Sequence, residues 1–188
     1  MGLRERILNA VVQEFDEKGV RFTMDELANR IGVSKRTIYE QVGNKEHIID
    51  ILISDAFLSI KAQEKEILEN DSLSLLEKLK TILGIMPNIV GGINYQKIFE
   101  LEKFYPDLYI KIEDNLERGW NVTLSLLNEA INQGIIRPVN PVLFKEILLI
   151  TMDNMLKSTF LFENNITYNE TVQFIIDVIF NGLLTGKV

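Results

Sequence analysis

Apolar residues recur at intervals of three and four along nearly the whole chain, and no stretch keeps the strict alternation that marks a half-buried strand. Such spacing places apolar side chains on one face of a helix, which must then pack against other helices. Over residues 3–18 this face consists of Leu3, Ile7, Leu8, Val11, Val12 and Phe15. The pattern predicts an all-α fold.

Helix-breaking and capping residues divide this pattern into separate helices. A fifth helix is expected to begin at a cap on Asp71 or Ser72, to kink at Pro87 and to end at Gly91. The other expected helices cover 3–18, 24–31, 35–42, 45–69, 94–104, 106–133, 141–163 and 168–185. We therefore expect an N-terminal three-helix head followed by a C-terminal helical body of about six helices.

The composition excludes several kinds of protein. The chain has no cysteine, and its single histidine, His47, has no second histidine with which to bind a metal, so we expect no metal site and no cofactor. We find no apolar run of membrane-spanning length and no signal-peptide core, and therefore expect a cytoplasmic protein without a membrane partner. The net charge of −7 argues against nonspecific coating of nucleic acid but allows binding through a small basic surface.

The segment 23–42 has the spacing of a helix-turn-helix motif. Thr23 and Glu26 form the capping-box pattern that begins a helix, and Gly32 permits a left-handed turn between the two helices. The apolar residues expected to hold these helices together and against 3–18 are Leu27, Ile31, Val33 and Ile38. The outward face of the second helix would then carry Lys35, Arg36, Tyr39, Glu40 and Gln41. A short helical hairpin with a solvated polar face would show the same pattern, so both interpretations stay open here.

Four sequence elements extend this motif in a fixed order: Thr23-Met-Asp-Glu-Leu-Ala28, Gly32-Val33-Ser34, Thr37-Ile38-Tyr39 and Gly43-Asn44-Lys45-Glu46. Over its first 50 residues the chain resembles the head of the tetracycline-repressor (TetR) family. The resemblance implies a helix-turn-helix DNA-binding domain over 1–46 and an all-helical ligand-sensing and dimerisation domain over 47–188. Gln41 and Val42 depart from it, because relatives often carry His and Phe at these positions.

The resemblance also implies which residues touch DNA. Lys35 and Arg36 would face the major groove, where Arg can read guanine, while Tyr39 and Lys45 would meet backbone phosphates. Two cations at a helix N-terminus oppose the helix dipole, which favours a functional role for this pair. The complete set of expected DNA contacts is Thr23, Ser34, Lys35, Arg36, Thr37, Tyr39, Glu40, Gln41 and Lys45.

The last two expected helices carry apolar residues around more of their circumference than one core-facing stripe requires. Members of the family form a four-helix bundle from this pair and its symmetry mate, so we expect a homodimer through these helices. A well-buried monomer core would show the same composition. Aromatic and methionine residues of the body suggest a ligand pocket, although such residues are also typical of a core: Phe57, Met86, Tyr95, Phe99, Phe104, Tyr105, Tyr109, Trp120, Met152 and Met155.

Together these features predict a DNA-binding transcriptional regulator. The first hypothesis is a ligand-responsive repressor that binds a palindromic double-stranded DNA operator as a homodimer and is released by a small apolar or amphipathic effector. The alternative is a regulator controlled by a protein partner, or an activator, without a small-molecule pocket. An enzyme is not expected, because the sequence has no Ser/His/Asp or Cys/His set, no phosphate-binding loop and no metal cluster.

Overall fold

The computed structural model describes residues 2–86 and 95–183, and within these ranges it is helical without any β-strand. The predicted all-α fold is therefore confirmed. The elements are α1 (Leu3–Lys18), η1 (Gly19–Arg21), α2 (Met24–Ile31), α3 (Lys35–Val42), α4 (Lys45–Glu69), α5 (Leu75–Leu83), η2 (Tyr95–Phe99), α6 (Glu100–Phe104), α7 (Pro106–Asn132), α8 (Pro141–Lys157), α9 (Phe160–Glu163) and α10 (Tyr168–Asn181). Among the described helices, none is both long enough and apolar enough to cross a membrane.

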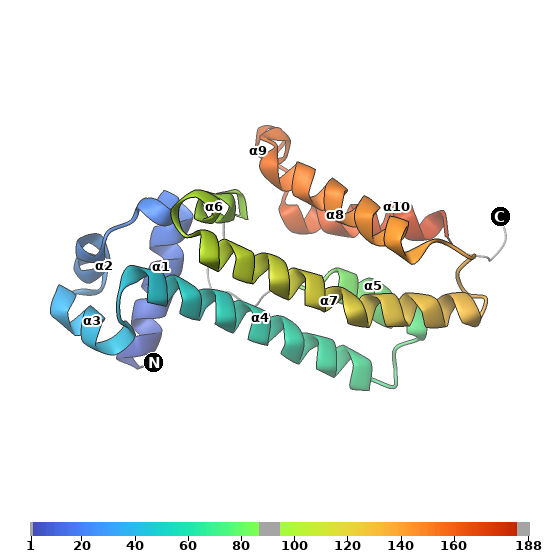
Figure 1. Cartoon of the computed structure of the whole chain (residues 1–188), viewed down its shortest axis with the longest axis horizontal. Coiled ribbons are helices and arrows are strands. Elements are labelled where there is room, and N and C mark those ends of the chain that lie inside the picture. The colour runs from blue at the N-terminus through green and yellow to red at the C-terminus, as the bar shows by residue number, and fades with distance from the viewer. Residues whose placement is uncertain (1, 87–94, 184–188) are drawn as a thin grey trace. The chain divides into compact units, whose positions relative to one another are not determined.

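The chain divides into two compact units, whose helices are labelled in Figure 1. The first unit is drawn from residues 1–59 and 87–115, and the second from residues 60–86 and 116–188. The first compact unit is thus larger than the predicted DNA-binding domain, because it includes the start of α4 together with η2, α6 and the start of α7. The predicted functional division at residue 46 stays a prediction.

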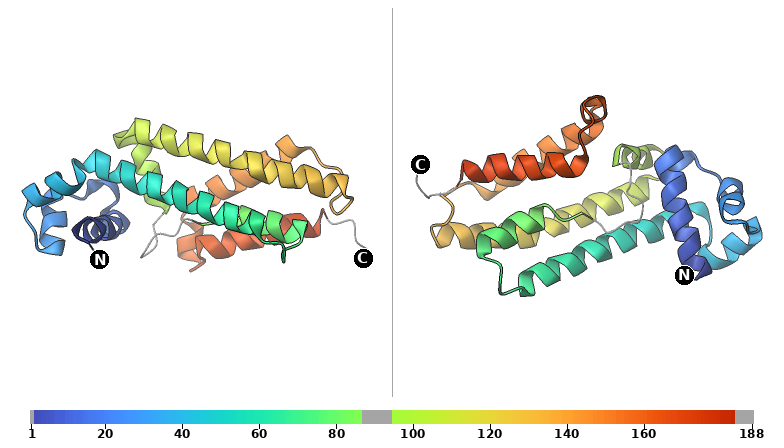
Figure 2. Two further views of the ribbon diagram at one scale, coloured as in Figure 1. Left: turned by 90° about the horizontal axis from the view of Figure 1, so that it is seen from below. Right: turned by 180° about the vertical axis from the view of Figure 1, so that it is seen from behind.

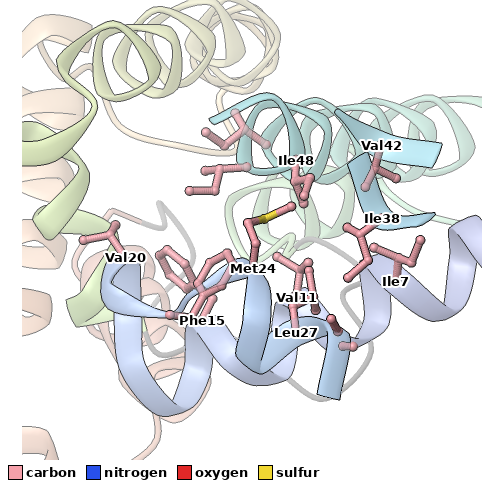
Figure 3. Close-up of a cluster of buried hydrophobic side chains, with 14 of the residues drawn as sticks. Ile7, Val11, Phe15, Val20, Met24, Leu27, Ile38, Val42 and Ile48 are labelled. Carbon is pink, nitrogen blue, oxygen red and sulfur yellow. The ribbon is translucent and has the colours of Figure 1, made fainter. Parts of the chain in front are cut away.

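The first unit is built on a core at the crossing of α1, α2 and α3 (Figure 3). Ile7 and Val11 of α1, Leu27 of α2 and Ile38 of α3 lie in this core and are completely buried. Ile48 of α4 is also completely buried in it. Apolar residues expected to hold the helix-turn-helix together, such as Leu27 and Ile38, therefore pack α2 and α3 against α1.

The second unit has its own core, formed by one face each of α5, α7, α8 and α10. Leu79, Leu127, Leu148 and Phe180 are completely buried there. The helices α8 and α10 contact each other and lie side by side (Figure 2). A T-shaped contact between the rings of Phe144 and Phe180, with centroids 6.1 Å apart, joins these two helices.

The beginning of α5 corrects one expectation. The cap is Ser74, not Asp71 or Ser72, because Ser74 and Glu77 form a complete capping box. The helix ends at Leu83 with Gly84 after it. Pro87, which was expected to kink this helix, and Gly91 lie outside the described residues.

Three further helix boundaries also differ from the expected ones. The helix expected over 141–163 ends at Lys157, because the Ser158 hydroxyl accepts a hydrogen bond from the backbone N–H of Phe160 (3.0 Å), which starts the short α9. The helix expected over 94–104 begins as the 3-10 segment η2 before α6. The last helix ends at Asn181, before the expected residue 185.

Candidate nucleic-acid interface

The turn between α2 and α3 has the geometry that a helix-turn-helix requires. Gly32 adopts a left-handed conformation with φ of 69°, which a side chain would disfavour. The backbone N–H of Val33 donates to the carbonyl oxygen of Ala28 (3.1 Å) and satisfies the end of α2. Because Leu27 and Ile38 are completely buried on the inner side, the opposite side of α3 faces solvent.

Hydroxyl groups cap both helices of the motif. The Thr23 hydroxyl accepts from the backbone N–H of Glu26 (3.2 Å), and the Glu26 carboxylate accepts from the backbone N–H of Thr23 (2.8 Å). The Ser34 hydroxyl accepts from the backbone N–H of Thr37 (3.1 Å) and shares a hydrogen bond with its hydroxyl (2.7 Å). Three of the predicted DNA contacts, Thr23, Ser34 and Thr37, thus fix the starts of α2 and α3 in the protein without DNA.

A buried carboxylate ties α2 to α1. Glu14 of α1, whose side chain is only 3% exposed, binds Arg30 of α2 at 2.6 Å and Lys18 at 2.8 Å. Burial alone would raise the pKa of Glu14, but its bonds to Lys18 and Arg30 outweigh burial and lower it. Arg30 also binds the exposed Glu17 at 2.6 Å. This network, which was not predicted from the sequence, orients the helix-turn-helix on α1.

The outward face of α3 carries two cations, each paired with a carboxylate. Lys35 binds Asp25 of α2 at 2.8 Å, and this bond raises the pKa of Lys35. Arg36 binds Glu40 one turn along α3, with 2.8 Å between Nε and Oε1. All four side chains are exposed, so neither pair prevents its cation from reaching DNA.

Two further residues of α3 that are predicted to contact DNA are also exposed. Tyr39 is 44% exposed, and Gln41 is also exposed. With Lys35, Arg36 and Glu40 they form the surface that we call the α3 face. It offers donors, acceptors and an aromatic ring, which are the groups that bind phosphates and base edges.

Lys45, at the start of α4, is held differently. Its ammonium donates to the carbonyl oxygen of Val20 and lies 4.4 Å from the centre of the Phe22 ring. Burial lowers the pKa of Lys45, and the nearby Glu26 carboxylate partly opposes this effect. In the protein without DNA this ammonium therefore has protein partners, and its contact with a phosphate stays a prediction.

Comparison with known proteins adds independent evidence. Residues 7–51 match the family model described as bacterial regulatory proteins, tetR family. The uncharacterized HTH-type transcriptional regulator YvaF of Bacillus subtilis is 31% identical over 183 residues, which are 97% of this chain and 96% of that protein. The chain belongs to the TetR family. It is accordingly a DNA-binding transcriptional regulator, and the expectation that it is not an enzyme is confirmed by this relationship.

Solved structures of TetR-type regulators have the same fold. The TetR family transcriptional regulator PfmR from Thermus thermophilus superposes with a TM-score of 0.72 at 21% identity, covering 94% of this chain and 97% of that one. The transcriptional regulator FadR from Bacillus subtilis, solved in complex with stearoyl-CoA, gives a TM-score of 0.64 at 20% identity, covering 95% and 98% of the two chains. At these identities the comparison supports the fold alone.

The predicted pocket residues of this TetR-family protein are distributed over both compact units. Those in the first unit are Phe57, Phe99, Phe104, Tyr105 and Tyr109. Those in the second unit are Met86, Trp120, Met152 and Met155. Phe104 is 47% exposed, and the side chain of Tyr95 lies outside the described part of the structure. Their assembly into one pocket stays a prediction.

Two shallow hollows of this TetR-family protein lie elsewhere. One, of about 300 Å³, lies in the first unit beside Arg6 and Arg30. The other, of about 370 Å³, lies in the second unit beside Arg137 and Leu143. Neither is lined by a predicted pocket residue.

Proposed function

We propose that this TetR-family protein is a ligand-responsive repressor that binds a palindromic operator as a homodimer. The observation that carries the proposal is the packed helix-turn-helix, whose apolar residues are buried while the polar α3 face is in solvent. In this proposal α3 enters the major groove, Arg36 reads guanine, and Tyr39 and Lys45 bind backbone phosphates. Thr23, Ser34, Thr37 and Gln41 complete the contact surface.

We assign the dimer interface to α8 and α10. Large apolar side chains on the outer sides of these helices are 56% to 69% exposed: Val142, Leu143, Ile147, Ile150, Phe174 and Val178. A patch of this kind is unfavourable in water and is typical of a protein–protein interface. We call these six residues the apolar patch. A second copy of the chain offers the same patch, as a twofold interface requires.

A twofold dimer explains the expected operator symmetry. Two α3 faces related by a twofold axis match two inverted half-sites about 34–36 Å apart, which is one turn of DNA. The two heads together would also supply twice the number of phosphate contacts. This is how a chain with a net charge of −7 can bind DNA with useful affinity.

The effector is proposed to be a small apolar or amphipathic molecule. The regulator FadR of Bacillus subtilis, which shares this fold, was solved with stearoyl-CoA. This makes a long-chain acyl thioester the first compound to test here. Binding to the predicted ligand-sensing domain, residues 47–188, would release DNA by favouring one orientation of α4, which begins beside the head at Lys45. Near-complete release requires a preference between the two orientations of about 5 kcal/mol.

One observation favours the alternative, a regulator controlled by a protein partner. The two described hollows contain none of the predicted pocket residues. A body without a ligand cavity would leave control to a protein that binds its surface. Release of operator DNA by stearoyl-CoA would exclude this alternative, whereas no release and no bound compound in the purified protein would favour it.

Selection of bound sequences from random DNA tests the proposed function. We expect an inverted repeat, bound with an affinity that falls steeply as salt concentration rises. The selected duplex then serves to measure release by stearoyl-CoA, with free coenzyme A as the control. Recovery of no common sequence, together with an affinity insensitive to salt, would contradict DNA recognition by the α3 face.

A further inference from the structure

The pair formed by Arg36 and Glu40 is poorly explained by the stability of α3. Arg36 lies in the first turn of the helix, where a cation opposes the helix dipole, and Glu40 lies in the last turn, where an anion does so. The order is also the less favourable one, since an acid four residues before a base stabilises a helix better than the reverse. With side chains 88% and 57% exposed, the pair adds little to folding.

Glu40 is equally hard to explain as a simple DNA contact. A carboxylate brought beside phosphates is repelled, and burying it against DNA requires a donor for its oxygens. Arg36 already supplies such a donor, because its Nε lies 2.8 Å from Glu40 Oε1. The structure therefore contains an arrangement in which Glu40 enters the interface with a donor already bound to its carboxylate.

Glu40 binds Arg36 through Nε, and this determines which nitrogens of Arg36 can contact a base. Guanine is recognised by two parallel N–H bonds from a guanidinium to O6 and N7. Because Glu40 occupies Nε, the two terminal nitrogens of Arg36 are the ones that remain for this contact. A guanidinium held at Nε also loses less rotational freedom when it binds.

We propose that Glu40 is a positioning residue for base recognition: its carboxylate holds Arg36 by Nε, so that the guanidinium presents its two terminal nitrogens to one guanine. This inference rests on the proposed function, in which Arg36 reads a base. Lys35 and Asp25 form a contrasting pair on the same surface. Asp25 lies in the first turn of α2, where an acid suits the helix dipole, so this pair has a structural explanation.

The test uses the full-length protein and the operator selected from random DNA. Arg36→Ala first identifies the base pair at which preference for guanine is lost. Affinities for the operator and for its single substitutions at that base pair then give the preference of each variant. We expect Glu40→Ala to reduce the preference for guanine about tenfold, and Glu40→Gln to keep most of it, since the amide oxygen still accepts from Nε.

Asp25→Asn is the matched control, because it removes an equal charge from the same surface. It should strengthen binding to all DNA and leave the preference for guanine unchanged. A wild-type preference in Glu40→Ala, or an equal loss in Glu40→Gln and Glu40→Ala, would overturn the positioning role. If Arg36→Ala alters no preference, the base contact of the proposed function fails as well. If only Arg36→Ala alters it, the role of Glu40 alone fails.

Discussion

The ammonium of Lys45 lies 4.4 Å from the centre of the Phe22 ring and donates a hydrogen bond to the carbonyl oxygen of Val20. This contact joins the start of α4 to the segment between α1 and α2. The same ammonium is the predicted phosphate ligand. The structural role of Lys45 and its role in DNA binding can be measured separately. Packing of the aliphatic stem contributes to the free energy of unfolding, whereas the charge contributes to DNA affinity.

Replacing Lys45 with Met keeps the stem against Phe22 and removes the ammonium. We expect the free energy of unfolding to fall by at most about 1 kcal/mol, since the lost hydrogen bond is offset by the lower cost of burial. DNA affinity should fall by a similar factor for every sequence, and the salt dependence should decrease by about one phosphate contact per subunit, which is about two for the dimer. Fluorescence anisotropy at several salt concentrations measures the DNA affinity and its salt dependence.

Lys65→Met is the control for Lys45→Met, because Lys65 is an exposed lysine of α4 that belongs to the second unit. Its replacement should change neither the stability nor the salt dependence. If Lys45→Met binds all DNA as tightly as the wild type does, Lys45 serves only the contact with Val20 and Phe22.

Glu14→Gln tests the network that orients α2 on α1. We expect a loss of about 2 kcal/mol at neutral pH, because Glu14 uses one oxygen for Arg30 and the other for Lys18, whereas Gln has a single acceptor oxygen and no charge. Glu17→Gln should cost less, since Glu17 binds the same Arg30 from an exposed position. Urea unfolding of the three proteins gives the comparison.

Acid should remove the contribution of Glu14. Its pKa is lower in the folded protein than the ordinary glutamate value of 4.5, so the unfolded chain takes up its proton first. The stabilisation is therefore fully present above pH 4.5 and is lost as pH falls through the folded pKa. We expect the wild type and Glu14→Gln to converge in stability on acidification. A constant difference between them would show that the carboxylate charge contributes nothing.

Three capping boxes allow a matched comparison between the units. Thr23→Ala, Ser74→Ala and Thr167→Ala each remove the hydroxyl that caps one helix, and each should cost about 1 kcal/mol. Only Thr23→Ala should also weaken DNA binding, because only this cap lies in the helix-turn-helix. Thermal unfolding and anisotropy measure the two effects. An equal loss of DNA affinity in Thr167→Ala would remove the special role of Thr23.

The apolar patch predicts the effect of a buried charge. Ile147→Glu and Phe174→Glu place a carboxylate in the proposed interface, and each should convert the dimer to a monomer with weaker operator binding. Leu58→Glu is the control, because Leu58 of α4 is 66% exposed but lies outside the patch. Sedimentation equilibrium distinguishes the two states. Dimers that persist in both patch variants would place the interface elsewhere.

Local patterns predicted the features that depend on neighbouring residues. The capping box at Thr23 and the left-handed Gly32 follow from chemistry within a few positions of the sequence. Ser74 has the same pattern, with Glu77 three residues later, so its cap could have been predicted from the sequence, whereas Asp71 and Ser72 have no Glu or Gln at that spacing. Apolar periodicity also does not reveal where a helix ends at a pair of polar residues such as Ser158-Thr159.

Contacts between distant residues were not predictable in this way. The bond between Arg36 and Glu40 has a helical spacing that the sequence displays, whereas Lys35 meets Asp25 only because α2 and α3 cross. The bond between Glu14 and Arg30 likewise depends on how α2 packs against α1. A ligand pocket depends on several helices at once, so aromatic and methionine residues alone could not specify it.

Recognition of DNA by the α3 face can be tested through the sequence preference of Arg36→Ala. Sequences would be selected from random DNA by the wild type, by Arg36→Ala and by Arg118→Ala, which replaces an exposed arginine of the second unit and serves as control. We expect the same inverted repeat for the wild type and Arg118→Ala, and loss of one preferred guanine in each half-site for Arg36→Ala. An unchanged sequence preference in Arg36→Ala would contradict recognition of DNA by the α3 face.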